Sequence, residues 1–127
     1  MDSRLKLDPT SPTPIFQQII DGFEGLIITG ALQEKAALPS VRELAVLHSV
    51  NPNTVSKAYQ LLQSMSLIEP VRGLGLRVSK IDAKLSKKRR SEILDTEVDR
   101  LISVAKTLQS TPLELTRLIQ ERWRGTL

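Results

Sequence analysis

The sequence contains no cysteine, one histidine and very few aromatic residues. The absence of cysteine excludes disulfides, thiolate metal sites and cysteine nucleophiles. The single histidine, His48, cannot form a histidine-rich metal site, so no metal or cofactor is expected. There is no apolar run near the ~18 residues that a membrane-spanning helix needs, and no signal-peptide pattern at the N-terminus. These absences predict a cytoplasmic protein that is not an enzyme and has no membrane partner.

Charge of both signs is present and only mildly unbalanced. The chain of 127 residues carries 18 Lys and Arg against 14 Asp and Glu, a net charge of +4. Residues 1–80 hold eight basic and seven acidic side chains, and residues 81–127 hold ten and seven. This balance favours an anionic partner only weakly. The nature of that partner must therefore come from the pattern of elements.

The first expected helix follows an arm that contains Pro9 and Pro12. Thr13 is expected to cap this helix, with Pro14 at its first position, and Gly30 to stop it. Apolar residues recur between them at helical spacing: Ile15, Ile19, Phe23, Leu26 and Ile27.

Two short helices are expected next. Ser40 and Glu43 form a capping box ahead of the first, which must break before Pro52 because residues that precede proline disfavour helical geometry. Asn51 is expected to cap the second, with Pro52 at its first position. The inner face of that second helix is expected to hold Val55, Ala58, Tyr59 and Leu62. Paired helices joined by a tight turn under a longer helix are typical of a helix-turn-helix.

A hairpin is expected after the paired helices. Residues 67–71 and 76–79 indicate strands, and residues 72–75 a flexible turn. The predicted fold class is mainly α with a small β-hairpin. We expect a winged helix-turn-helix DNA-binding domain in residues 1–80 and a short C-terminal helical dimerisation region in residues 81–127.

The C-terminal region has a different pattern. Residues 81–110 are expected to be helical with a heptad seam, and Thr111, Pro112 and Glu114 restart a helix with a capping box. Burying one leucine is worth about 1.5–3 kcal/mol, so the seam needs a cover. We expect a two-fold dimer, with an intrachain hairpin in a monomer as the alternative. The predicted dimerisation residues are Leu94, Val98, Leu101, Ile102, Ala105, Leu108, Leu115, Leu118, Ile119 and Trp123.

The second of the paired helices is expected to enter the major groove of double-stranded DNA, where its N-terminal residues meet the base edges. Arg42, on the preceding helix, is placed to reach the backbone or a base. The alternative is that Asn51 and Thr54 only cap a helix and that Lys57 only faces solvent. The candidate contacts on the second helix are Asn51, Asn53, Thr54, Ser56 and Lys57.

Three segments carry a resemblance to a known family: LPSVRELA at residues 38–45, VNPNTV at residues 50–55, and Ala58-Tyr59 with Leu62. Together they resemble the GntR family of winged helix-turn-helix repressors, and NPNTV with the short C-terminal part looks like its YtrA subfamily. The resemblance implies a cytoplasmic homodimer that binds an imperfect palindrome and represses nearby genes. Its DNA-contacting positions correspond to Ser40, Arg42, Asn53, Thr54, Ser56, Lys57 and the turn from Gly73 to Gly75.

The sequence departs from the family pattern at three places. Glycine is usual where Ser66 stands, and Glu34-Lys35-Ala36 replaces the usual Pro-Gly-Asp. The wing, commonly Gly-Arg-Gly-Thr-Phe-Val, reads GLGLRV from Gly73. Leu74 cannot make the polar minor-groove contact of an arginine, so Arg72 or Arg77 is expected to replace it.

Several alternatives stay open from the sequence. A winged helix that binds a protein in place of specific DNA is the main one, since a fold does not determine a function. Trp123 is expected at the dimer interface, with stacking on a small-molecule effector of unknown identity as the alternative. The basic run at residues 87–90 is expected to face solvent, with phosphate contact as its alternative. His48 is expected at the surface of its helix.

Overall fold

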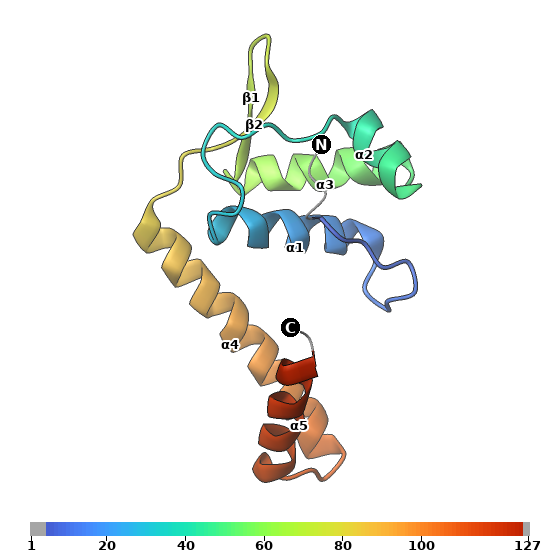
Figure 1. Ribbon diagram of the computed structural model, residues 1–127, viewed down its shortest axis with the longest axis vertical. Helices are drawn as coiled ribbons and strands as arrows, with labels where there is room; N and C mark the ends of the chain where they lie inside the picture. The colour runs from blue at the N-terminus through green and yellow to red at the C-terminus, as the bar shows by residue number, and fades with distance from the viewer. Residues whose placement is uncertain (1–4, 126–127) are drawn as a thin grey trace. The chain divides into compact units, whose positions relative to one another are not determined.

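The computed structural model describes residues 5–125, and Figure 1 shows its helices and strands. Their order is α1 Ile15–Ile28, α2 Val41–His48, α3 Pro52–Ser64, β1 Ile68–Val71, β2 Gly75–Val78, α4 Ala83–Thr107 and α5 Pro112–Gly125. The chain divides into two compact units, one that ends at Lys87 and one that begins at Lys88. The expected mainly helical fold with a small hairpin is confirmed. Among the described residues, no helix has both the length and the apolar character needed to span a membrane.

The core of the first unit forms where α1 and α2 both pack against α3 (Figure 1). The four inner residues expected on α3 are all buried. Phe23 of α1 meets Tyr59 of α3 edge to face, with ring centroids 5.8 Å apart. Such a pair adds about 0.5–1.5 kcal/mol to the stabilisation from burial. The apolar faces of α1 and α3 therefore pack into one shared core.

The caps of α2 and α3 are those that the sequence predicted. The Glu43 N–H donates to the Ser40 hydroxyl at 3.0 Å, and the Ser40 N–H donates to the Glu43 carboxylate at 3.2 Å. The Asn51 side chain accepts from the Asn53 N–H at 2.8 Å, with Pro52 as the first helical residue. His48, expected at the surface, is half-buried at the end of α2.

The predicted cap of α1 is wrong. The helix begins at Ile15, one residue late, and Pro14 is its cap residue without a side-chain hydrogen bond. The amide of Gln18 explains this start, because it donates to the main-chain carbonyls of Thr13 and Asp8 at 2.8 and 2.9 Å. Its oxygen also accepts from the Asp8 N–H at 2.7 Å. One side chain thus holds the arm in place of the predicted hydroxyl cap.

The hairpin is antiparallel, with Ile68 opposite Val78 and Val71 opposite Gly75. Strand β2 begins at Gly75, one residue earlier than expected. Residues 35–38, which precede α2, pair with the other edge of β2, an arrangement that the sequence did not predict. Val78 exchanges two main-chain hydrogen bonds of 2.9 Å with Lys35 and Ala36 there. The wing is thus attached along its base to the segment that leads into α2.

The second unit contains the rest of α4 and all of α5. Helix α4 begins at Ala83, two residues later than the expected residue 81. Asp82 precedes it, and its carboxylate accepts from the Lys84 N–H at 2.7 Å. At the start of α5 the Glu114 N–H donates to the Thr111 hydroxyl at 3.2 Å, which is one of the two bonds of the predicted capping box. The Glu114 carboxylate accepts from the Ser110 hydroxyl at 2.9 Å in place of the Thr111 N–H, so the second bond was predicted wrongly.

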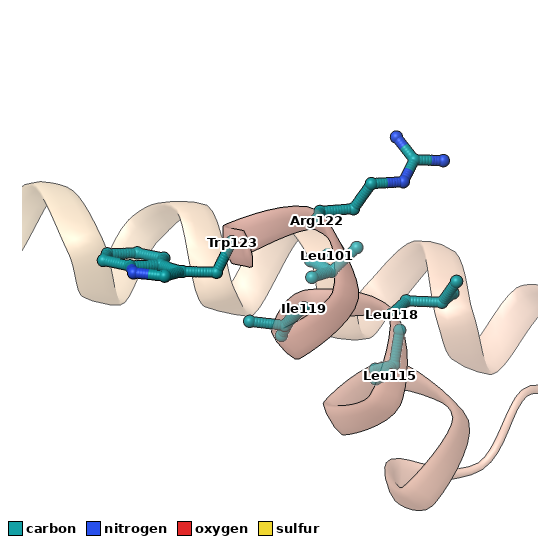
Figure 2. Close-up of a pocket in the computed structure, with 6 residues that line it drawn as sticks. All are labelled: Leu101, Leu115, Leu118, Ile119, Arg122 and Trp123. Carbon is teal, nitrogen blue, oxygen red and sulfur yellow. The ribbon is translucent and has the colours of Figure 1, made fainter. Parts of the chain in front are cut away.

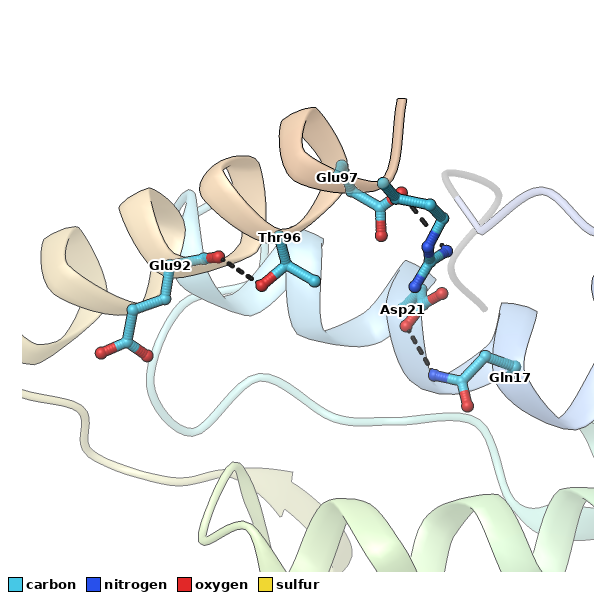
Figure 3. Close-up of polar contacts among 6 residues, drawn as sticks. Gln17, Asp21, Glu92, Thr96 and Glu97 are labelled. Carbon is cyan, nitrogen blue, oxygen red and sulfur yellow. Dashed lines mark hydrogen bonds and ion pairs between the residues drawn. The ribbon is translucent and has the colours of Figure 1, made fainter. Parts of the chain in front are cut away.

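Exposed residues of α1 and of α4 make short polar contacts within each helix (Figure 3). In α1 the Gln17 amide donates to the Asp21 carboxylate at 2.8 Å. In α4 the Thr96 hydroxyl donates to the Glu92 main-chain carbonyl at 3.0 Å. Contacts between exposed residues of one helix turn are worth only a few tenths of a kcal/mol, so packing must determine the position of each helix.

The turn that follows α3 contains a residue in a left-handed conformation that is not glycine. Ser66 has φ 61°, its N–H donates to the Gln63 carbonyl, and the Leu67 N–H donates to the Leu62 carbonyl. This pair of bonds is the Schellman motif, in which glycine is preferred because it has no Cβ. Lys35 also has a positive φ, of 70°. Both positions are those where the GntR pattern has glycine, so the chain keeps the backbone shape without the residue that suits it best.

We predict that Ser66→Gly increases the free energy of unfolding by up to about 1 kcal/mol. The left-handed conformation costs a side-chain-bearing residue about 1–2 kcal/mol, and the greater freedom of glycine in the unfolded chain offsets part of this gain. Ser64→Gly is the matched control, because Ser64 has helical geometry at the end of α3. Glycine there should lower the free energy of unfolding, by at most about 0.5–1 kcal/mol. Urea unfolding of the three proteins checks the order, and a Ser66→Gly protein no more stable than Ser64→Gly would contradict it.

Candidate nucleic-acid interface and apolar helical face

Tyr59 joins the two helices of the helix-turn-helix. Its hydroxyl, on α3, donates to the main-chain carbonyl of Pro39 at 2.7 Å, and both groups are buried. Pro39 directly precedes the Ser40 cap, so this bond holds the start of α2 against α3. Burial raises the pKa of the Tyr59 phenol well above its ordinary value, and the Glu43 carboxylate raises it further. The neutral hydroxyl is therefore the form that the fold stabilises.

The predicted contact residues on α3 gather at its N-terminal end. Asn51, Asn53 and Lys57 are exposed, while Thr54 and Ser56 are half-buried. The Asn51 side-chain oxygen accepts from the Asn53 N–H. The two N–H groups of the Asn51 side-chain amide are not used in this bond and can donate to a ligand. The main-chain N–H groups of Asn53 and Thr54 are already bonded to Asn51, so an anion at this end would be held by side chains. The structure thus brings an amide pair, hydroxyls and a cation to one end of one helix.

Arg42 of α2 and Lys57 of α3 are exposed cations. Arg42 lies in the first turn of α2, after the exposed Ser40. Within residues 5–125, neither the Arg42 guanidinium nor the Lys57 ammonium has a hydrogen bond or an ion pair with another side chain. Charges without a protein partner are available to phosphate oxygens or base edges.

The two arginines of the wing differ in their surroundings. Arg72 is exposed next to the turn, where Gly73 and Gly75 have φ values of 79° and 77°. Arg77 is half-buried, and its guanidinium donates to the Leu74 carbonyl at 3.1 Å and to the Lys35 carbonyl at 3.4 Å. Arg77 thus joins the wing tip to the segment before α2, and Arg72 is left as the cation that faces outward.

The second unit presents apolar side chains to solvent. Ala105 is buried and Leu115 is half-buried, but the other predicted seam residues are exposed, from 39% for Ile102 to 74% for Leu108. A groove of about 400 Å³ runs between α4 and α5 (Figure 2). Its walls are Leu101, Leu115, Leu118, Ile119, Arg122 and Trp123. The intrachain contact of these helices therefore leaves most of the seam uncovered.

Paired short helices under α1, followed by a hairpin, define the winged helix-turn-helix class. Residues 16–78 match the family model described as bacterial regulatory proteins, gntR family. The chain belongs to this GntR family, and the resemblance inferred from LPSVRELA and VNPNTV is confirmed.

The similar proteins include YtrA members of the family. The chain is 47% identical over 75 residues to the HTH-type transcriptional repressor YtrA of Bacillus subtilis (strain 168), covering 59% of this chain and 58% of the repressor. A GntR family transcriptional regulator from Listeria monocytogenes has a TM-score of 0.71 and 28% identity, over 91% of this chain and 98% of that one. YtrA from Sulfolobus acidocaldarius, a GntR-family transcription factor, has a TM-score of 0.58 and 34% identity, over 80% of this chain and 99% of that one. The chain thus matches a little more than half of the Bacillus repressor's length.

We predict that Tyr59→Phe lowers the free energy of unfolding by about 1–3 kcal/mol, because it leaves the buried Pro39 carbonyl without its donor. The pH dependence should change as well. A folded-state pKa above the unfolded value contributes stability below the unfolded pKa of about 10, and this stability is lost as the pH rises beyond it. Denaturant unfolding between pH 8 and pH 11 should show a steeper alkaline loss for Tyr59 than for phenylalanine. Parallel curves would contradict the assigned role.

Proposed function

We propose that this protein is a transcriptional regulator, a homodimeric repressor that binds a palindromic operator in double-stranded DNA. Residues 1–80 form the DNA-binding domain in this proposal, and residues 81–127 the dimerisation region. The observation that carries the proposal is the exposed polar start of α3, together with Lys57 on the same helix and Arg42 on α2, two exposed cations that have no protein partner among residues 5–125. Membership of the GntR family and similarity to a transcriptional repressor support it.

The proposed base contacts come from α3 in the major groove. The Asn53 amide can make paired hydrogen bonds with adenine, and Lys57 can approach the acceptor atoms of guanine. The side chains of Asn51, Thr54 and Ser56, near the helix start, suit phosphates. These five positions offer both base-reading and backbone-positioning groups within two turns of one helix.

The proposed backbone contacts come from α2 and the wing. The Ser40 hydroxyl accepts from the Glu43 N–H and still has its own proton to donate to a phosphate. Arg42 supplies a charge there. At the wing, Gly73 and Gly75 allow close approach of the turn, and the exposed Arg72 is the side chain proposed for the minor groove.

Arg77 makes a smaller contribution in this proposal. Two carbonyl oxygens already accept hydrogen bonds from its guanidinium. A guanidinium has five donors, so Arg77 can still offer some of them to a phosphate. Its main role in the proposal is to hold the shape of the turn that presents Arg72.

The proposed dimer explains the apolar face of α4 and α5. Leu94, Val98 and Leu101 follow heptad spacing along α4 and are 40–56% exposed. A second copy that packs against this face would bury them, at about 0.8 kcal/mol for each buried methylene group. Two-fold symmetry would also present two α3 helices to successive major grooves, about 34–36 Å apart.

Selection from a random pool of double-stranded DNA tests the proposal. We expect the retained sequences to share a two-fold-symmetric motif with half-sites about one helical turn apart. Affinity should fall steeply with salt, since neutralised phosphates release counterions. A folded, dimeric preparation that enriches no motif would contradict specific DNA binding and favour a protein-interaction role for the winged helix.

We predict that Lys57→Ala and Asn53→Ala each weaken binding to the selected DNA by about 5- to 100-fold, since a good base contact is worth about 1–3 kcal/mol. Fluorescence anisotropy with the selected duplex measures this, and light scattering should show an unchanged oligomeric mass. Lys106→Ala, on the exposed surface of α4, is the control of equal charge. Equal loss of affinity in all variants would remove α3 from the recognition surface.

We predict that Leu101→Asp converts the protein to monomers and sharply lowers its affinity for DNA that contains both half-sites. A buried carboxylate without a partner is strongly unfavourable at an interface of two helices. Leu85→Asp is the matched control, because Leu85 lies on α4 outside the heptad seam and is 62% exposed. Light scattering distinguishes the two variants. An unchanged mass for Leu101→Asp would exclude this face as the interface.

A further inference from the structure

The polar face of α3 extends beyond the residues already assigned to DNA. Asn53, Lys57, Gln60 and Ser64 are all exposed and follow one another at spacings of four, three and four residues. At about 100° per residue these positions form one stripe along the helix. The buried residues of α3 lie on the opposite side. The stripe is therefore a continuation of the surface that Asn53 and Lys57 begin.

Gln60 is the amide on this stripe that lies beyond Lys57. Within the described part of the chain its side chain makes no hydrogen bond. The next stripe residue, Ser64, donates its hydroxyl proton to the Leu61 carbonyl at 2.7 Å, which is an ordinary contact within a helix. Gln60 thus has a donor and an acceptor available at its tip, while the Ser64 proton is already used.

We propose that Gln60 reads a base edge in the major groove, with adenine as the base it prefers. This inference rests on the proposed function. Gln60 follows Asn53 by seven residues, which is about 10 Å along the helix axis. Base pairs are spaced by about 3.4 Å, so an α3 that lies along the groove would place Gln60 roughly three base pairs from Asn53.

The chemistry of the side chain determines the preference. A glutamine amide matches the N6 donor and N7 acceptor of adenine with two hydrogen bonds, whereas a carboxylate accepts from the cytosine N4 amino group. Glutamine carries no charge, so its contribution should not depend on counterion release. Loss of Gln60 should therefore change the base preference without changing the salt dependence.

The test compares Gln60→Ala and Gln60→Glu with the wild-type protein in selection from a random duplex pool. Gln63→Ala is the matched control, because Gln63 is an exposed glutamine of the same helix that lies outside the stripe, about 80° from Asn53 and about 120° from Lys57. For Gln60→Ala we expect adenine preference at one symmetric pair of positions to fall by about 5- to 100-fold, with the rest of the motif retained. For Gln60→Glu the preference there should move toward cytosine, and the motif of Gln63→Ala should equal that of the wild type.

The outcomes separate this inference from the proposed function. A wild-type motif that Gln60→Ala leaves unchanged overturns the inference alone. A folded Gln60→Ala protein with uniformly weaker binding and no positional change also overturns it, because Gln60 would then add affinity without reading a base. A wild-type protein that enriches no motif overturns the proposed function and the inference together. Thermal unfolding by circular dichroism confirms that each variant is folded.

Discussion

The hydrogen bond from Tyr59 to the Pro39 carbonyl carries the arrangement on which the rest of the first unit depends. Tyr59 packs its ring against Phe23 of α1 and directs its hydroxyl to the carbonyl of Pro39, two residues before α2 begins. One side chain of α3 therefore positions both other helices. Because Arg42 follows Pro39 by three residues, its distance from the polar end of α3 depends on this buried contact. Exposed charges contribute little stability. The relative position of the exposed residues on α2 and α3 therefore depends on buried contacts such as this one.

The wing depends on a second non-local contact. Arg77 extends from β2 to carbonyls at the wing tip and at Lys35, and residues 35–38 pair with the same strand. The segment that leads into α2 is thus also the support of the hairpin. The guanidinium of Arg77 is engaged in holding the hairpin to this segment. The exposed Arg72 is therefore better suited than Arg77 to contact a ligand at the turn.

Local signals in the sequence predicted most of the helices. Ser40 with Glu43, and Asn51 with Pro52, contain the donors and acceptors of their own helix starts, so the caps of α2 and α3 were predicted correctly. The Thr13 cap was wrong because the Gln18 side chain bonds to the arm across several residues. The pairing of residues 35–38 with β2 was missed because a segment with one bridge has no periodic pattern.

The candidate site was predictable in its composition but less so in its geometry. The sequence indicated Asn53 and Lys57, whereas the different surroundings of Arg72 and Arg77 depend on contacts far along the chain. Gln60, the residue proposed to read a base, follows Asn53 and Lys57 at helical spacing that is visible in the sequence, but its exposure on α3 comes from the structure. The heptad seam on α4 was predicted as apolar, and its exposure in a single chain is the physical reason for proposing a second copy.

Chemical protection of DNA shows whether a dimer reads its operator with α3. Dimethyl sulfate methylates guanine N7, an atom that lies in the major groove. With a duplex that the protein has selected, we expect protection in two major-groove segments one helical turn apart, each facing an α3 helix of one copy. Protection of a single segment, or methylation equal to that of free DNA, would contradict a dimer that reads its operator with α3.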